Sequence, residues 1–325
     1  MATQLTTIPA APLQAYASTL VPTLFTGAGE NASYRFIEYF AARIRNPHTR
    51  EAYFRAVNRF SQWCTLRQLE LIQLNPVVIA SYIEALQGEL GVTSVKQHLS
   101  AIRMLFDYLV TGHIVPFNPA QAVQAPRYSA SEGKTPILSA AETRQLLDAI
   151  DITHVWGLRN RALIGVLVFS CARVSAVVGM KLEDYFPEGK EWKLRLHEKR
   201  GKRHVVPAHH QAMEYLDAYI AAAGFQGAPK KPLFRQFTRG RVLTDEAMTR
   251  HAAVQMVKRY AQQVGLPASI CCHTFRGTGI TIALENGSTL EEAQRLANHS
   301  DIRTTLLYDR RDKTVKRGVV ERIII

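Results

Sequence analysis

The sequence predicts a mainly α-helical protein of two domains, the second of which also holds a small antiparallel sheet. Three observations lead to this prediction. Apolar residues recur at helical spacing along most of the chain, and two short segments after residue 190 alternate apolar and polar residues as half-buried strands do. Residues 126–135 are polar and contain Pro, Gly and Ser, which indicates an interdomain linker. The length of 325 residues also suits two domains of ordinary size.

Residues 1–30 are rich in Ala, Thr and Pro and hold no Lys or Arg, which predicts a flexible N-terminal arm and not a secretory signal. Residues 31–125 predict a domain of four helices, because apolar side chains recur there every three or four positions. Asn46-Pro47 should separate the first two helices, and Asn75-Pro76 has the cap-and-proline pattern of a helix start. The helices are expected at residues 34–44, after a cap at Thr49, from Pro76 to about residue 86, and from Thr93 to about residue 111.

Residues 136–325 predict the second domain. Its first helix follows a capping box formed by Ser139 and Glu142. Further helices are expected at about residues 158–170, 210–222, 245–264, 277–285 and 290–297, and strands at residues 192–197 and 204–206. A basic turn at Gly201 joins the two strands, so they should form an antiparallel hairpin.

The net charge of +13 and the pI of about 9.7 favour an anionic partner, most often nucleic acid. Residues 1–129 hold 10 Lys and Arg against 7 Asp and Glu, a surplus of three, so the remaining residues carry ten of the thirteen net charges. If the partner is DNA, the second domain should therefore hold more of the phosphate contact. No apolar run reaches the roughly 20 residues that a membrane-spanning helix needs, so no membrane association is expected.

The four cysteines form no C-x-x-C pair and no even framework, which predicts free thiols in a reducing, cytoplasmic compartment. A zinc site at Cys271, Cys272 and His273 is disfavoured, because zinc ligands are usually separated by two or more residues. No metal site and no cofactor are expected.

Four short patterns stand in order in the second domain. They are Ala172-Arg173-Val174-Ser175, His197-Glu-Lys199-Arg-Gly-Lys202, His273-Thr-Phe-Arg276, and Ala297-Asn-His299 followed nine residues later by Tyr308. Each residue alone is weak support for a site, since a lone Arg is most often a surface charge and a lone Tyr a packing residue. The indication comes from their joint order, spacing and type of element.

These residue types suit transfer of a DNA phosphodiester to a protein hydroxyl. Negative charge builds on the non-bridging oxygens of the phosphate in the transition state, so two fixed arginines can clamp it. A tyrosine can be the nucleophile if a base takes its proton, because its free pKa is about 10. A lysine between two strands can protonate the leaving 5′-oxygen if neighbouring cations lower its pKa. The sequence offers no carboxylate cluster to hold magnesium.

In this order the residues resemble the tyrosine recombinase family, which includes the lambda-type integrases, the Xer recombinases and Cre. The resemblance runs from about residue 31 to the end of the chain, and A-N-H-S-D-I-R-T-T-L-L-Y is similar to the family's L-G-H-x-x-x-x-T-T-x-x-Y. The family's catalytic pattern falls on Arg173, Lys199, His273, Arg276, His299 and Tyr308. The resemblance implies a four-helix, SAM-like core-binding domain and a mostly helical catalytic domain with a small sheet, and it implies cutting and rejoining of DNA.

The resemblance also implies roles for these residues. The two arginines would bind the scissile phosphate, and His299 would hydrogen-bond it. Lys199 would be the general acid to the 5′-hydroxyl, and His273 would act as the base or assist it. Tyr308 would attack and form a 3′-phosphotyrosine, which the hydroxyl of a partner strand reverses, so no ATP is needed.

The sequence departs from the family's pattern at two positions. An acidic residue is common three positions after the first arginine, and here the residue is Ala176. We expect either retained but tempered activity or a substitute from elsewhere, such as Glu183 or Asp184. Asn298 stands where glycine usually precedes the histidine, and Asn tolerates the left-handed backbone that such a turn needs.

The expected partner is double-stranded DNA with an inverted-repeat core site. Lys96, Ser100 and Arg103 share one face of a predicted helix that a DNA groove could receive, although an ordinary solvated face is an equal alternative. Arg50, Lys202 and Arg203 are further candidates for DNA contact. The resemblance implies a homodimer on one site and a tetramer in the synapse. The apolar tail after Tyr308 would dock in a neighbouring protomer or pack on its own core.

Two other functions stay open: a catalytically idle DNA-binding accessory protein on the same scaffold, and a type IB-like topoisomerase. The intact set of six residues argues against the first. The usual topoisomerase fingerprint, a tyrosine soon after S-K, is absent. Within the recombinases, the arm has no basic residue before Arg35, which favours an enzyme of the Xer or Cre sort or one encoded by a transposon.

Overall fold

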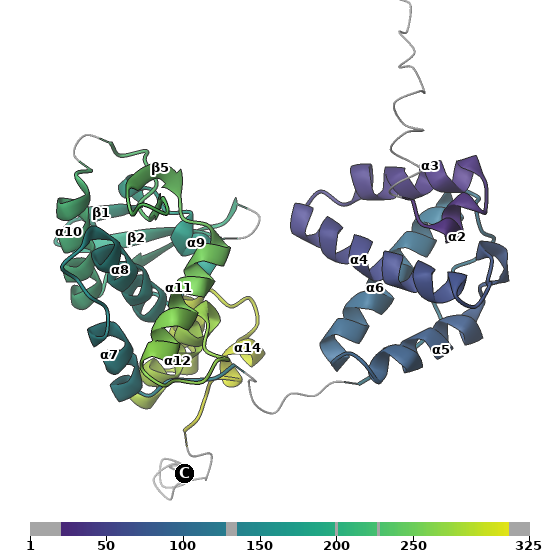
Figure 1. The fold of residues 1–325 in the computed structure, drawn as a ribbon. Coiled ribbons are helices and arrows are strands. Elements are labelled where there is room, and N and C mark those ends of the chain that lie inside the picture. The colour runs from purple at the N-terminus through teal and green to yellow at the C-terminus, as the bar shows by residue number, and fades with distance from the viewer. Residues whose placement is uncertain (1–20, 128–134, 199–200, 226–227, 312–325) are drawn as a thin grey trace, which may run out of the picture. The chain divides into compact units, whose positions relative to one another are not determined.

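The computed structural model describes residues 21–127, 135–198, 201–225 and 228–311, and the chain divides into two compact units, residues 1–129 and 130–325. Both units are mainly helical and the second holds small antiparallel sheets, so the predicted fold class is confirmed (Figure 1). None of the helices in the described residues combines the length and apolarity that crossing a membrane requires.

The N-terminal unit packs its helices around one core of aromatic and aliphatic side chains. Its helical elements are α2 (Thr23–Thr26), α3 (Glu30–Glu38), the π-helical η1 (Tyr39–Arg43), α4 (Pro47–Thr65), the 3-10 turn η2 (Leu71–Gln73), α5 (Pro76–Gln87) and α6 (Val92–Thr111). The Asn75 side chain caps α5 as predicted. The expected cap at Thr49 is wrong, because Asn46 accepts hydrogen bonds from two backbone amides and Pro47 opens the helix.

The prediction of a flexible arm is wrong for residues 21–30. Residues 21–30 contain α2 and the start of α3, and Leu24 and Phe25 are buried in the core of the unit. The Phe25 ring lies 4.7 Å from the ring of Phe36, so apolar burial fixes this segment. Residues 1–20 lie outside the described residues.

The C-terminal unit is built around α8 (Val155–Phe169), which is buried along most of its length and packs against α10 and α12. Its other helical elements are α7 (Ala140–Asp148), α9 (Val174–Val178), η3 (Leu182–Asp184), α10 (His210–Ala223), α11 (Arg250–Gln263), α12 (Cys272–Glu285), α13 (Leu290–Ala297) and α14 (Ile302–Leu306). The capping box before α7 is present as predicted. Gly279 lets α12 approach α8 closely, since a side chain there would overlap the carbonyl oxygen of Val168.

A three-stranded antiparallel sheet of β1 (Tyr185–Glu188), β2 (Glu191–His197) and β3 (Arg203–Pro207) covers one side of this unit. The two outer strands pair with β2, the second of the three, and Leu194 faces Tyr185 on one side and Val206 on the other. The predicted hairpin is therefore present.

The predicted start of a helix at Asp245 is wrong. That residue lies in β5 (Leu243–Ala247), which pairs with β4 (Arg235–Phe237). Helix α11 begins only at Arg250, where the Thr249 side chain accepts a hydrogen bond from the backbone amide of Ala252 and caps it.

Candidate active site

Tyr308 directly follows α14, and its ring lies along one face of α12. The phenol oxygen is 3.1 Å from Nε2 of His273, the ring packs over Gly277, and the Thr281 hydroxyl donates to the Tyr308 carbonyl over 2.9 Å. These three contacts come from positions four residues apart, which share one stripe of a helix. Tyr308 is only 6% exposed. The tyrosine is therefore held with its hydroxyl against a histidine.

Arg276 lies on the same helix and is 1% exposed. Its guanidinium donates to the carbonyl of Cys171, two residues before Arg173, and to the carbonyl of Ala297, two residues before His299. Burial, followed by the proximity of Arg173, lowers the pKa of the Arg276 guanidinium. Two bonds leave further N–H donors of the five in its fork, so the group can both hold the fold and bind an anion.

Arg173 stands at the start of α9, just after a turn in which Cys171 adopts a left-handed backbone with φ of 51°. Its Nη1 donates to the carboxylate of Glu198 over 2.6 Å. The Arg173 side chain is 38% exposed, whereas that of Glu198 is 5% exposed. Arg173 therefore has one edge fixed by a buried carboxylate while other donors still reach solvent.

His299 completes the group. Its Nδ1 is 3.0 Å from the Thr305 hydroxyl, and its ring lies parallel to that of Tyr308 at 6.1 Å. Asn298 before it has φ of 50°, so the left-handed turn predicted for this residue is confirmed. Burial, followed by the charges of Arg276 and Arg173, lowers the pKa of His299 to about 4. The same causes, in the same order, lower the pKa of His273. The lowered pKa values favour the neutral form of both rings.

The structure brings five of the six predicted catalytic residues together, and the sixth, Lys199, lies outside the described residues. Lys202 and Arg203 are exposed where the β2–β3 turn ends. On α6, Lys96 is half-buried and Ser100 is exposed.

Two of the arginines proposed to contact DNA make internal contacts. Arg50 donates twice to the carbonyl of Ile44, over 3.1 and 2.8 Å. Arg103 donates to the carbonyls of Ala120 and Val123. Both side chains thus stabilise chain turns, a role that helical spacing alone does not reveal.

The suggestion that Glu183 or Asp184 replaces the acid missing at position 176 is wrong. Asp184 accepts hydrogen bonds from His197 and from the backbone amide of Lys181, and Glu183 lies 3.8 Å from the Lys181 ammonium. Neither contacts Arg173, and Glu198 does. The alternation of β2 could have identified Glu198, because it follows the buried Leu194 and Leu196 at the next position on the same face.

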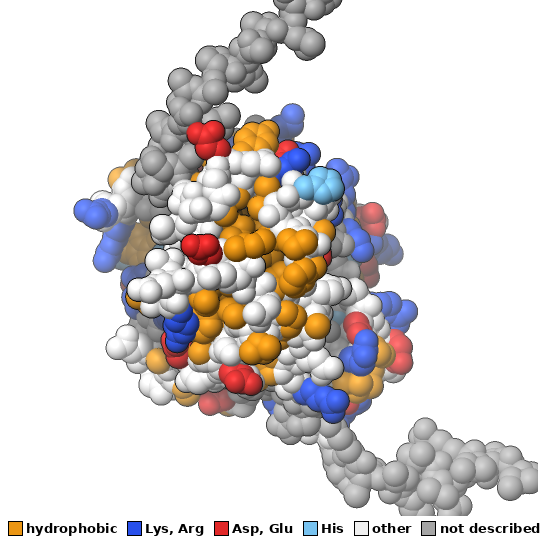
Figure 2. Space-filling model, turned by 90° about the vertical axis from the view of Figure 1, so that its right-hand side faces the viewer, with side chains coloured by type: hydrophobic (Ala, Val, Ile, Leu, Met, Phe, Trp, Pro, Cys, Tyr) orange, Lys and Arg blue, Asp and Glu red, His pale blue; other side chains and the backbone are white. Residues whose placement is uncertain are grey.

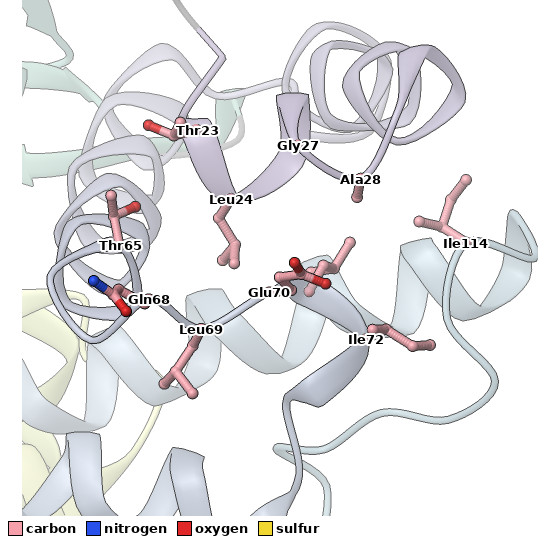
Figure 3. A pocket seen from close by; sticks show the side chains of 11 residues that line it. Thr23, Leu24, Gly27, Ala28, Thr65, Gln68, Leu69, Glu70, Ile72 and Ile114 are labelled. Carbon is pink, nitrogen blue, oxygen red and sulfur yellow. The ribbon is translucent and has the colours of Figure 1, made fainter.

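A pocket of about 410 Å³ lies in the N-terminal unit, between α2 and the η2 turn (Figure 3). Its lining includes Leu24, Leu69 and Ile72, and Glu70 is its single charged residue. Figure 2 shows one face of the molecule, and hydrophobic side chains gather along the middle of that face. Among the lining residues that the structure describes there is no Lys or Arg that could bind a phosphate.

Comparison with known proteins agrees with this geometry. Residues 136–314 match the phage integrase family, and residues 34–113 match the N-terminal SAM-like domain of phage integrases. The tyrosine recombinase XerD of Pseudomonas aeruginosa is 29% identical over 265 residues, which cover 80% of this chain and 86% of XerD. The tyrosine recombinase XerC of Myxococcus xanthus is 27% identical over 284 residues, which cover 84% of this chain and 91% of XerC.

Two solved structures have the same fold. The XerH site-specific recombinase, in its post-cleavage complex with palindromic difH substrate, gives a TM-score of 0.70 at 17% identity and covers 91% of this chain and 89% of XerH. A lambda integrase dimer bound to a COC′ core site gives 0.66 at 17% identity and covers 96% of this chain and 85% of the integrase.

Proposed function

Since the chain belongs to the phage integrase family, we propose that it is a site-specific DNA recombinase that cuts and rejoins DNA through Tyr308. The observation that carries the proposal is the Tyr308 hydroxyl, 3.1 Å from the neutral ring of His273 and beside two arginines. The XerC, XerD and XerH relatives are recombinases by name, and their activity is what we assign to this chain.

In the first step, the Tyr308 oxygen attacks the scissile phosphorus and its proton passes to Nε2 of His273. A bond from the tyrosine oxygen to phosphorus forms, and the bond from phosphorus to the 5′-oxygen breaks. Lys199 supplies the proton to the leaving 5′-oxygen. The phosphodiester energy is kept in the 3′-phosphotyrosine, so attack by the 5′-hydroxyl of a partner strand reverses the step without ATP.

Stabilisation of the transition state comes from fixed donors. Arg173 and Arg276 would bind the non-bridging oxygens, where negative charge builds, and their backbone and carboxylate contacts place them before substrate arrives. If the Thr305 hydroxyl donates to Nδ1 of His299, the proton of this neutral ring lies on Nε2 and can be donated to the phosphate. The site offers no support to an idle accessory protein, because none of its described catalytic groups is replaced.

The partner would be double-stranded DNA with an inverted-repeat core site, bound by a homodimer and joined to a second site in a tetramer. Residues 312–325, which contain the apolar tail, lie outside the described residues, and we propose that this tail docks in a neighbouring protomer. The enzyme would act in the cytoplasm, in association with the nucleoid.

A covalent trap tests the proposal. Wild type and Tyr308→Phe would be incubated with nicked fragments of the source genome in EDTA, and SDS-resistant protein–DNA adducts would be counted and sequenced. We expect adducts with wild type alone, enriched in one inverted-repeat sequence. Intact DNA binding without any wild-type adduct would favour the idle accessory protein instead.

A further inference from the structure

Glu198 is a buried carboxylate whose charge partner is Arg173. It stands one residue beyond β2, where its backbone amide donates to the Lys202 carbonyl over 2.8 Å and continues the ladder between β2 and β3. Its side chain lies on the buried face of the strand, after Leu194 and Leu196. The carboxylate is therefore fixed by the sheet and not by the helices that carry the other site residues.

The surroundings of Glu198 are cationic. Arg173 lowers the pKa of Arg276, His273 and His299, which means that these groups feel each other's charge. The negative charge of Glu198 acts in the opposite direction and offsets part of the lowering of the Arg276 pKa. In the part of the chain that the structure describes, it is the one carboxylate hydrogen-bonded to a guanidinium of this cluster.

We propose that Glu198 is a positioning residue of the recombinase site, and that it holds Arg173 in the phosphate-binding position. The acidic residue that is common in α9 cannot do this here, because Ala176 stands in its place. This inference rests on the proposed function. One Nη1 contact fixes the guanidinium and leaves its other donors for the substrate. The acids of η3 do not serve, because Asp184 is bonded to His197 and Glu183 faces Lys181.

The carboxylate has two opposing effects on the substrate. Its orientation of Arg173 lowers the barrier, because a donor misplaced by about 1 Å can cost about a hundredfold in rate. Its negative charge repels the phosphate, which weakens binding. A variant without the carboxylate should therefore bind DNA as tightly as wild type or more tightly, yet cut it more slowly.

The first test compares wild type, Glu198→Ala and Glu198→Gln, with Glu183→Gln as the matched control. The probe is the nicked duplex recovered from the covalent trap, with single-turnover adduct formation and the Kd from fluorescence anisotropy as readouts. We expect Glu198→Ala to slow adduct formation by about ten- to a hundredfold with an unchanged or lower Kd, and Glu198→Gln, which keeps an acceptor, to lose less. A wild-type rate in Glu198→Ala, or a parallel loss of rate and binding, overturns the proposal.

The second test needs no DNA. Without its counter-charge the cluster repels itself, so inorganic phosphate should raise the Tm of Glu198→Gln by more than it raises the Tm of wild type or Glu183→Gln. An equal rise in all three proteins overturns the proposal, whether or not wild type cuts DNA. A larger rise in Glu198→Gln together with no wild-type adduct would instead count against the proposed function.

Discussion

Gly277 lies directly under the Tyr308 ring, which makes Gly277→Ala a sharp probe of the position of the proposed nucleophile. An added Cβ would sit 3.0 Å from Cε1 and 3.3 Å from Cδ1 of the ring. Carbon atoms pack best about 3.5 to 4.0 Å apart, so the ring must move by roughly 0.5 to 1 Å. Since a displacement of about 1 Å can cost about a hundredfold, we expect adduct formation to slow by about ten- to a hundredfold.

The stability of the fold should change much less than the cutting rate in Gly277→Ala. Ala is favoured over Gly in a helix interior by about 1 kcal/mol, which offsets much of the ring's displacement, so the Tm should fall little or rise. DNA affinity should be unchanged, because the arginines proposed to bind the phosphate are untouched. Gly279→Ala on the same helix is the contrast, because its Cβ would overlap backbone at Val168, and that variant should lose stability. A wild-type cutting rate in Gly277→Ala would refute the placement of Tyr308.

Four further predictions follow from the site and from α6. Tyr308→Phe should abolish the covalent adduct in the trap but keep the Kd, because only a hydroxyl bonded to His273 is lost. Because the pKa of His299 is lowered in the fold, its ring takes up a proton at a higher pH in the unfolded chain than in the folded chain. This residue therefore contributes stability above about pH 6.5 that is lost as the pH falls toward 4. A plot of Tm against pH should be flatter in His299→Gln than in wild type. If Lys96 contacts a phosphate, Lys96→Ala should reduce the steepness of the plot of log affinity against log salt concentration by about one unit. Arg103→Ala should lower the Tm, because it removes hydrogen bonds to two backbone carbonyls.

Each of these has a clear contrary result. Loss of DNA binding in Tyr308→Phe would mean that the tyrosine is structural. Parallel Tm curves for wild type and His299→Gln would mean that the ring titrates normally in the fold. An unchanged salt slope in Lys96→Ala would assign that face of α6 to solvent, and an unchanged Tm in Arg103→Ala would mean that its carbonyl contacts add nothing to stability.

Much of the helical framework could be predicted from local sequence, because caps and apolar periodicity act within a few residues. Asn75 and Ser139 illustrate this, since each caps a helix through its own side chain. The errors arose where two local signals competed. Both Asn46 and Thr49 can cap a helix, and only the chain's path into α4 decides between them. The segment at Asp245 is polar enough for either a helix or an edge strand, and its pairing with β4 is a contact that periodicity does not encode.

The residues proposed as catalytic could be identified from the sequence, because phosphoryl transfer restricts which side chains can serve. The carboxylate that contacts Arg173 could not, because a counter-charge can reach this guanidinium from several elements. The family pattern directs attention to α9, where Ala176 stands, and to the nearby acids of η3. The structure uses neither and supplies Glu198 from the sheet. A supporting carboxylate is constrained by distance to a guanidinium and not by spacing along the chain, so it can move between elements while the catalytic pattern stays fixed.

This distinction also decides which variants can report on chemistry alone. Arg276 holds the carbonyls of Cys171 and Ala297 inside the protein, and removing it would leave buried acceptors unpaired at about 1 to 3 kcal/mol each. A loss of activity in an Arg276 variant would therefore mix lost phosphate binding with a disturbed fold. Among the described residues, the Tyr308 hydroxyl has a hydrogen bond to His273 alone, and the Glu198 side chain has one to Arg173 alone. Variants at these two positions change one contact each, and the reaction can be dissected through them.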